Sequence, residues 1–221
     1  MERIEDLLIE NLKIYQDDSL YTFTSDSILL SKFAKGKKGD IVADFCSGSG
    51  IVGIHFYALN KKTTKSVTLF EMQKPLAELS KKSIEINGLN EIFAVENCKI
   101  QEIGKEYANK FSLILCNPPY MEIGSGDGDK NPSIDICKRE VELKLEELIK
   151  KIAYSLKFSG RTCIVHRVER LAETICLMEK YKITAKKLQF VSAPNKEPYL
   201  FLIEGVKGGK KGIKVLNNIN N

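Results

Sequence analysis

Four consecutive residues, Asn117-Pro118-Pro119-Tyr120, could hold a planar amino group for a reaction at its nitrogen. They directly follow an apolar run, Phe111–Cys116, which predicts a buried strand with this motif at its carboxyl end. The two prolines remove two backbone N–H donors, which leaves the asparagine oxygen and the Pro118 carbonyl to accept both N–H bonds of an amine. The tyrosine ring supplies a flat face for stacking. Such a site acts by positioning and by fixed dipoles, and it turns the nitrogen lone pair toward a methyl donor.

A glycine-rich loop earlier in the chain is the second chemical feature. Gly48, Gly50 and Gly53 form G-x-G-x-x-G between a predicted strand and a predicted helix, and Glu71 ends the next predicted strand. Small residues let the backbone approach a ligand, and a carboxylate in that place accepts hydrogen bonds from ribose hydroxyls. Taken alone, this pattern fits a nicotinamide dinucleotide as well as S-adenosylmethionine, and a tight turn without a ligand is the third interpretation.

Asp44, at the end of the strand before this loop, favours S-adenosylmethionine, because a carboxylate there can organise the loop and face a cationic ligand. The spacing D-x-C-x-G-x-G resembles the cofactor loop of class I S-adenosylmethionine-dependent methyltransferases, and the NPPY motif downstream decides for that cofactor over a dinucleotide. Cys46 stands where the pattern has its first glycine. We therefore expect the φ angle of Cys46 to avoid the values that favour glycine.

Alternating apolar strands and amphipathic helices must position these motifs. The predicted strands are Ile41–Phe45, Val67–Glu71, Ile92–Val95, Phe111–Cys116, Thr162–His166, Lys187–Val191 and Leu200–Glu204. The predicted helices are Ser25–Phe33, Ile51–Leu59, Pro75–Asn87, Glu140–Tyr154 and Leu171–Glu179. This order predicts an α/β protein with a mostly parallel seven-stranded sheet and helices on both faces. The resemblance of the cofactor loop implies that this sheet has the Rossmann-like class I methyltransferase fold. Residues 1–39 are predicted as a lead-in that covers the cofactor, 40–206 as the methyltransferase domain and 207–221 as a basic tail.

Further segments resemble one family more closely. They are YTFTSDSILLSKFA, the KRE of Lys138–Glu140, VHRVERL at Val165–Leu171 and KEPYLFLIEGVKGGKKG at Lys196–Gly212. Together with DFCSGSG and LILCNPPY they resemble the bacterial tRNA1(Val) (adenine-N6)-methyltransferases, from about Leu12 to Leu216. The resemblance implies S-adenosylmethionine-dependent methylation of N6 of the adenine just 3′ of the anticodon.

The resemblance also implies roles for the residues that match. Phe23, Thr24 and Asp26 are expected against the methionine end of the cofactor, and Asp44, Cys46, Gly48 and Gly50 in its loop. Glu71 should hold the ribose, and Met72 should pack on the cofactor's adenine. Asn117, Pro118, Pro119 and Tyr120 should form the target-base site, with Asn117 also next to the cofactor. Lys99 stands where relatives often have an acid, so either Asn97 or the backbone of Cys98 is expected to bind the cofactor's adenine, or the adenine is held less specifically.

The charge of the chain is uneven. Residues 157–221 carry 13 Lys+Arg against five Asp+Glu, a net charge of +8, whereas the first 156 residues carry −3 of the overall +5. This basic part favours tRNA as the partner, and a solvated lysine-rich surface is the alternative. The residues expected to bind RNA are Arg161, Arg167, Arg170, Lys186, Lys187, Lys210 and Lys211.

Other features narrow the class of protein. The six cysteines contain no C-x-x-C pair and the two histidines lie far apart, so no metal site is expected. No apolar run approaches the roughly 20 residues that span a bilayer, and the acidic N-terminus has no signal-peptide pattern, which predicts a cytoplasmic protein without a membrane segment. The sequence does not indicate an oligomeric state.

Three alternatives for the function stay open at this point. A release-factor glutamine-N5 methyltransferase also uses NPPY on a planar amide, but such enzymes carry an N-terminal helical domain, and about 39 residues precede the first predicted core strand here. A ribosomal RNA amino-methyltransferase shares the core motifs. A non-catalytic RNA-binding module with a relic cofactor pocket is the non-enzyme alternative, against which Asp44, Glu71 and NPPY argue.

Overall fold

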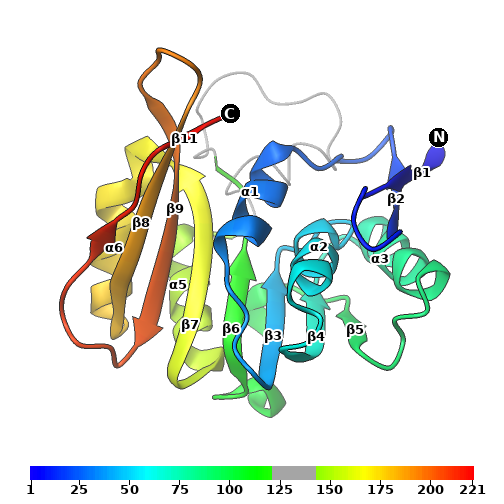
Figure 1. Cartoon of the computed structure of the whole chain (residues 1–221). Coiled ribbons are helices and arrows are strands. Elements are labelled where there is room, and N and C mark those ends of the chain that lie inside the picture. Colours follow the sequence, from blue (N-terminus) through cyan, green and yellow to red (C-terminus); the bar gives the residue numbers. More distant parts are fainter. Residues whose placement is uncertain (121–142) are drawn as a thin grey trace.

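The apolar strands pair into a single central sheet, shown from one face in Figure 1. The computed structural model describes residues 1–120 and 143–221, so the KRE of Lys138–Glu140 lies outside the described residues. Within them, the sheet has nine strands in the order β10-β8-β9-β7-β6-β3-β4-β5, and β11 also pairs with β8. The strands are β3 (Asp40–Phe45), β4 (Thr64–Phe70), β5 (Phe93–Glu96), β6 (Phe111–Cys116), β7 (Leu156–Arg167), β8 (Ile183–Ser192), β9 (Pro198–Lys207), β10 (Lys214–Val215) and β11 (Ile219–Asn220).

The predicted class of fold is confirmed, and the predicted number of strands is corrected. The strands from β3 to β9 correspond to the seven predicted ones; β10 and β11, of two residues each, are added along the outer edge of β8. Two residues are too few to form a periodic hydrophobic pattern, so sequence reasoning could not find these strands. The sheet is parallel except for β9, which runs antiparallel to both β7 and β8.

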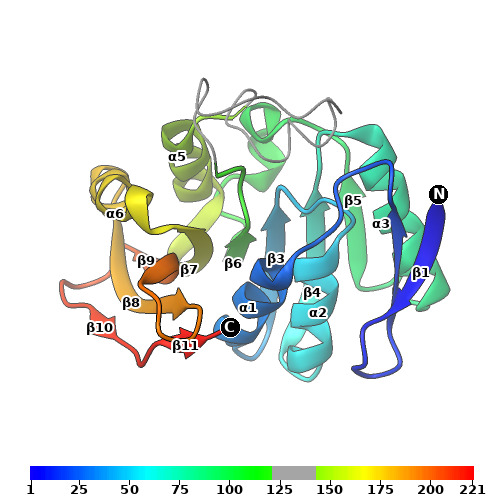
Figure 2. The same cartoon turned by 90° about the horizontal axis from the view of Figure 1, so that it is seen from above.

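Helices cover both faces of the sheet, as Figure 2 shows from above. One face is covered by α1 (Ser25–Phe33), α2 (Ile51–Asn60) and α3 (Lys74–Ile86), and the other by α5 (Leu145–Ser155) and α6 (Leu171–Lys180). Successive residues of a strand point to opposite faces. In β6, Leu113 and Leu115 therefore belong to the core under α1 and α2, whereas Ile114 and Cys116 belong to the core under α5.

The N-terminal segment forms a hairpin that sequence reasoning missed. Strands β1 (Glu2–Asp6) and β2 (Lys13–Asp17) pair with each other and lie beside α3. The Tyr15 N–H donates to Ser83 Oγ at 2.9 Å, and the Lys13 N–H donates to Asn87 Oδ1 at 2.9 Å. Ile14 is fully buried in the core, and Gln16, on the same side of β2, is also buried. Because the hairpin packs against α3, the Gln16 side chain lies next to the glycine loop and is hydrogen-bonded to Ser49.

The order of the strands creates a crevice at the sheet's carboxyl edge. The chain runs outward from β3 through β4 to β5 on one side, and from β6 to β7 on the other, so β3 and β6 are neighbours at a topological switch point. The helix α2, which follows β3, and α5, the next described helix after β6, lie on opposite faces of the sheet, which marks the position where open α/β sheets bind ligands. The glycine loop and the NPPY motif follow these two strands.

Candidate active site

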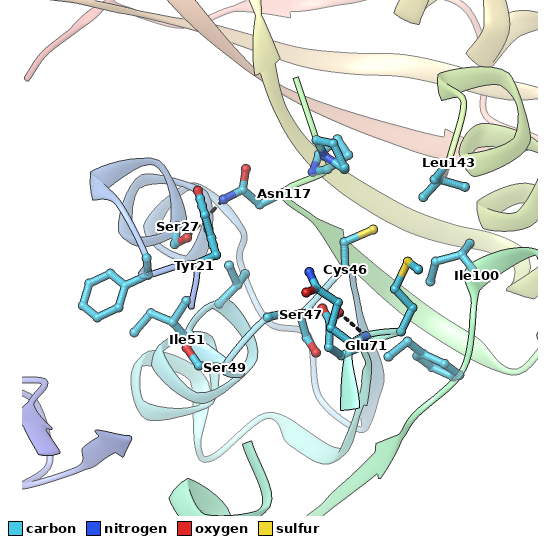
Figure 3. A pocket seen from close by; sticks show the side chains of 18 of the residues that line it. Tyr21, Ser27, Cys46, Ser47, Ser49, Ile51, Glu71, Ile100, Asn117 and Leu143 are labelled. Atoms are coloured by element: carbon cyan, nitrogen blue, oxygen red, sulfur yellow. Dashed lines mark hydrogen bonds between the residues drawn. The ribbon is translucent and has the colours of Figure 1, made fainter. Parts of the chain in front are cut away.

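A cavity of about 250 Å³ lies at this switch point. Figure 3 shows Asn117 on one side of it, next to Ser27, and Ile100 and Leu143 on another. The predicted site residues that line it are Phe23, Thr24, Asp26, Cys46, Gly48, Glu71, Met72, Cys98, Asn117, Pro118, Pro119 and Tyr120. Three other predicted residues, Asp44, Gly50 and Asn97, are not among the residues that line it.

Glu71 links the glycine loop to the end of β4. One carboxylate oxygen accepts the Gly48 N–H at 2.8 Å and the other accepts the Gln73 N–H at 2.8 Å. Burial raises the pKa of the Glu71 carboxyl, and these backbone donors offset part of that rise. A carboxylate has about four lone-pair sites. Glu71 therefore keeps acceptor capacity toward the cavity while its orientation is fixed.

Asp44 organises the loop from behind. Its side chain is fully buried, and Oδ2 accepts the Gly53 N–H at 2.9 Å near the start of α2. Oδ1 has no hydrogen-bond partner among the described residues. Burial raises the pKa of Asp44 to about 8, and the nearby Glu71 charge adds to this rise. The carboxyl is therefore largely protonated near neutral pH.

This raised pKa predicts a dependence of stability on pH. The unfolded chain loses the Asp44 proton near its ordinary pKa of 3.8, whereas the folded protein keeps it to about pH 8. The folded state binds the extra proton between these values, so the free energy of unfolding should fall by up to about 1.4 kcal/mol per pH unit as pH rises from about 4 to 8. Asp44→Asn should remove this component, measured as the difference between the pH profiles of denaturant unfolding for the two proteins. Parallel profiles would contradict the assignment.

The backbone at Cys46 corrects an expectation. Its φ angle is +60°, in the left-handed region that we expected the cysteine to avoid. A non-glycine residue in such a conformation costs on the order of 1–3 kcal/mol, which the surrounding structure must offset. The Ser47 N–H donates to the Phe70 carbonyl at 3.0 Å, and Gly50 N–H to the Ser47 carbonyl at 2.8 Å. These hydrogen bonds hold the loop in this turn, and the small Cys46 thiol lies beside the buried Cys116.

Gly50 and Asn97 support the cavity without lining it. Gly50 precedes α2 with φ +89°, and a Cβ there would lie 2.9 Å from the Leu69 side chain. Asn97 Nδ2 donates to the carbonyls of Glu71 (2.8 Å) and Met72 (3.0 Å), which holds the end of β4. Asn97 and the backbone of Cys98 were the two groups expected to bind the cofactor's adenine in place of an acid. Of these two residues, Cys98 lines the cavity.

The NPPY motif is tied to α1 by its side chains. Asn117 Nδ2 donates to Ser27 Oγ at 3.1 Å, and the Tyr120 hydroxyl is hydrogen-bonded to Asn117 Oδ1 and lies 3.2 Å from Asp26 Oδ2. Burial, together with the Asp26 carboxylate, raises the pKa of Tyr120 well above its ordinary value. The hydroxyl therefore stays protonated and donates. Buried His166 supports the tyrosine ring, with the two ring centroids 5.3 Å apart.

This network changes what is expected of Tyr120→Phe. A role for the ring face alone would make that substitution mild, but the hydroxyl orients the Asn117 amide. One such hydrogen bond contributes about 1 kcal/mol, so we expect turnover to fall about fivefold with the cofactor Kd unchanged. Single-turnover methylation beside separate cofactor titration checks this. Ser27→Ala is the companion variant, because it removes the other partner of Asn117; turnover at the wild-type rate in both would show that the network does not position the amide.

The structure also corrects one predicted RNA contact. Arg161 is 4% exposed, and its guanidinium donates to Asp40 Oδ2 at 2.7 Å and to the Lys35 carbonyl at 2.6 Å. The positive charge of Arg161 therefore forms an ion pair inside the fold and is not presented at the surface. Lys186 and Lys187 lie on β8, and Lys210 and Lys211 lie on the segment between β9 and β10, at the side of the sheet that β8 and β10 form.

Some lining residues were not among the predicted site residues. Tyr21, Ser27, Ser47, Ser49, Ile51, Val52, Phe70, Gln73, Ile100, Gln101, Leu143 and Arg167 are of this kind. Most are neighbours in sequence of predicted residues and could have been found by extending the motifs. Among the described residues, no cluster of three or more His, Cys, Asp or Glu side chains is arranged to hold a metal ion. The helices of the same ranges include none that is long and apolar enough to cross a bilayer.

Comparison with known families identifies this arrangement. A sequence model of the methyltransferase small domain family matches residues 24–191. The chain belongs to this family. The matched range of this methyltransferase small domain includes the glycine loop, Glu71, the NPPY motif and the end of β7, so it contains most of the cavity wall.

Curated relatives of this methyltransferase small domain carry two names. The tRNA1(Val) (adenine(37)-N6)-methyltransferase of a Flavobacteriaceae bacterium (strain 3519-10) is 24% identical over 152 residues, which are 69% of this chain and 62% of the relative. That of Cytophaga hutchinsonii is 27% identical and covers 54% of this chain and 48% of the relative. A release factor glutamine methyltransferase of Mycoplasma mycoides is 30% identical, with 72% and 59% covered. The chain thus spans about half to three fifths of these relatives' length.

Solved structures share the fold of this methyltransferase small domain at low sequence identity. A predicted O-methyltransferase from Agrobacterium tumefaciens superposes with a TM-score of 0.69 at 18% identity, covering 88% of this chain and 86% of that one. The TYW2 protein of M. jannaschii, crystallised with AdoMet, gives a TM-score of 0.64 at 13% identity and covers 93% and 85%. These structures confirm the predicted Rossmann-like methyltransferase fold. The family model and the curated relatives, not these structures, confirm the predicted family resemblance.

Proposed function

We propose that this protein transfers the methyl group of S-adenosylmethionine to the N6 amino group of an adenine in tRNA, the adenine 3′ of the anticodon of tRNA1(Val). The observation that carries the proposal is that one cavity joins Glu71 and Met72 to the NPPY motif. A cofactor and a planar amine can therefore lie side by side in it. Family membership and the names of the curated tRNA relatives support the same reaction.

The residues at one end of the cavity fit S-adenosylmethionine. Glu71 offers an oriented carboxylate for the ribose hydroxyls, and Gly48, with open space where a Cβ would be, lets the loop approach the ligand. Met72 and Ile100 offer apolar surface for the adenine ring. Phe23, Thr24 and Asp26 come from the segment before α1 and its first turn, on the side toward Asn117. When bound, the cofactor supplies an electrophilic methyl group.

At the other end, the NPPY motif would hold the target nitrogen. Asn117 Oδ1 and the Pro118 carbonyl would accept the two N–H bonds of the adenine amino group, and Tyr120 would stack on the base. An adenine in an anticodon loop can be unstacked at low free-energy cost, which makes it accessible to such a site. These contacts turn the nitrogen lone pair toward the methyl group without a strong base, because the nitrogen loses its proton only once it carries the methyl.

A release-factor glutamine is the second candidate substrate, because the Mycoplasma mycoides relative is 30% identical and a glutamine amide is also a planar NH₂ group. One assay separates the candidates. The protein is incubated with S-adenosylmethionine and, in parallel, with an unmodified anticodon stem-loop of tRNA1(Val), ribosomal RNA or a release factor. Mass spectrometry of the nucleosides and peptides should find N6-methyladenosine in the stem-loop alone.

Cofactor titration completes this test. S-adenosylhomocysteine should bind and NAD should not; NAD binding without a response to S-adenosylhomocysteine would overturn the choice of cofactor. Cofactor binding without methylation of any of these acceptors would favour a relic pocket in an RNA-binding module. Methyl transfer to the release factor alone would assign the protein-directed reaction instead.

A further inference from the structure

Arg167 is the one cationic side chain among the described residues that line the cavity; the other charged residues there are Asp26 and Glu71. Arg167 is the last residue of β7, which pairs with β6, the strand that leads into the NPPY motif. The side chain is exposed, and its guanidinium carbon lies 5.8 Å from the centroid of the Tyr120 ring. No carboxylate of the described residues forms an ion pair with it. The Arg167 guanidinium thus lies at the target-base end of the cavity, in an ion pair with none of the residues that the structure describes.

Two other arginines of the basic C-terminal part form ion pairs within the fold. Arg161 is buried against Asp40, and Arg170, mostly buried, donates to Glu173 at 2.6 Å. The backbone N–H of Arg167 donates to His166 Nδ1 at 2.9 Å, which fixes the end of β7 and leaves the guanidinium to reach a ligand. Burial lowers the pKa of His166 to about 3, so His166 adds no positive charge beside the tyrosine.

We propose that Arg167 binds a phosphate adjoining the target base, so that the cavity selects a nucleotide and rejects the amide of a protein glutamine. This inference rests on the proposed function and names the group by which the substrate class is recognised. A guanidinium matches the oxygens of a phosphate in a fork and also stacks on aromatic rings. A base held on Tyr120 carries a phosphate on either side of its sugar, within reach of a cation at that ring. A glutamine side chain offers this cation no charged partner.

The experiment compares Arg167→Met and Arg167→Lys with the wild type on the unmodified anticodon stem-loop. Methionine keeps most of the aliphatic packing without the charge. Lysine keeps the charge but lacks the planar guanidinium that can donate two parallel hydrogen bonds to a phosphate. Arg167→Met should raise KM for the RNA about tenfold, with kcat changed less than about twofold and the Kd for S-adenosylhomocysteine unchanged. Arg167→Lys should recover part of the loss. Lys62→Ala, which removes one exposed charge from the turn between α2 and β4, outside the cavity, should match the wild type.

A second substrate series identifies the group that Arg167 contacts. Stem-loops with a single uncharged methylphosphonate 5′ or 3′ of the target adenine should bind the wild type more weakly at one of these positions. At that position the methylphosphonate should not weaken RNA binding by Arg167→Met any further, because this variant already lacks the contact between Arg167 and the phosphate. Equal KM values for Arg167→Met and the wild type, or undiminished methylphosphonate penalties in the variant, would overturn the inference. Methylation of release factor but not RNA by the wild type would instead overturn the proposed function itself.

Discussion

Asn117→Ala should lower single-turnover methylation of the stem-loop by about 10²–10³-fold while leaving cofactor affinity nearly unchanged, by analogy with the loss of one preorganised polar contact. The geometry explains why the substitution should affect turnover and not cofactor affinity. Asn117 follows β6, whereas Glu71 and the glycine loop follow β4 and β3, so the amide faces the cavity from a different strand end. The substitution also frees Tyr120 and Ser27, which are both hydrogen-bonded to Asn117.

The control for this prediction is Asn90→Ala, which removes the same amide from an exposed position outside the cavity. It should methylate at the wild-type rate. Cofactor Kd and thermal unfolding are measured for both variants, so that a misfolded site is recognised. A wild-type rate for Asn117→Ala, or a defect that lies wholly in cofactor binding, would refute the role of this amide at the target base.

Glu71→Ala should weaken binding of S-adenosylhomocysteine by about 1.5–3 kcal/mol, or roughly 10- to 150-fold, the usual contribution of hydrogen bonds to a charged group. The substitution also removes acceptors from the Gly48 and Gln73 N–H groups, and this structural effect must be separated from the ribose contact. Calorimetric titration with the ligand and its 2′- and 3′-deoxy analogues does so. The wild type should discriminate against a deoxy analogue, whereas Glu71→Ala should bind it as well as the parent ligand. If the variant still discriminates, Glu71 does not hold the ribose.

The sequence predicted those parts of the site that depend on local pattern. Phe111–Cys116 is apolar except for Ser112 because both faces of the strand are covered, and the motifs at the strand ends follow from the order of the elements. Contacts between distant segments were not predictable in this way. Ser27 reaches Asn117 from α1, and Arg167 reaches the Tyr120 ring from β7, across separations that no periodic pattern records.

Two further differences have local physical causes. Cys46 was expected to avoid a positive φ because of its residue type, but the hydrogen bonds around the loop determine its backbone conformation. Arg161 was counted as a surface charge, whereas Asp40 and Glu204 hold it inside the fold. Net charge over a segment does not distinguish a solvated cation from a buried ion pair, and only the tertiary structure does so.

The buried Gln16 of the N-terminal hairpin joins two walls of the cavity through one side chain. Its Oε1 accepts the Phe23 N–H at 3.2 Å, and its Nε2 is hydrogen-bonded to Ser49 Oγ of the glycine loop. Both segments are therefore ordered before a ligand arrives, and the conformational entropy of fixing them is lost when the chain folds. A ligand that touches both walls loses little further entropy on binding. Its affinity thus depends on an amide that does not itself line the cavity.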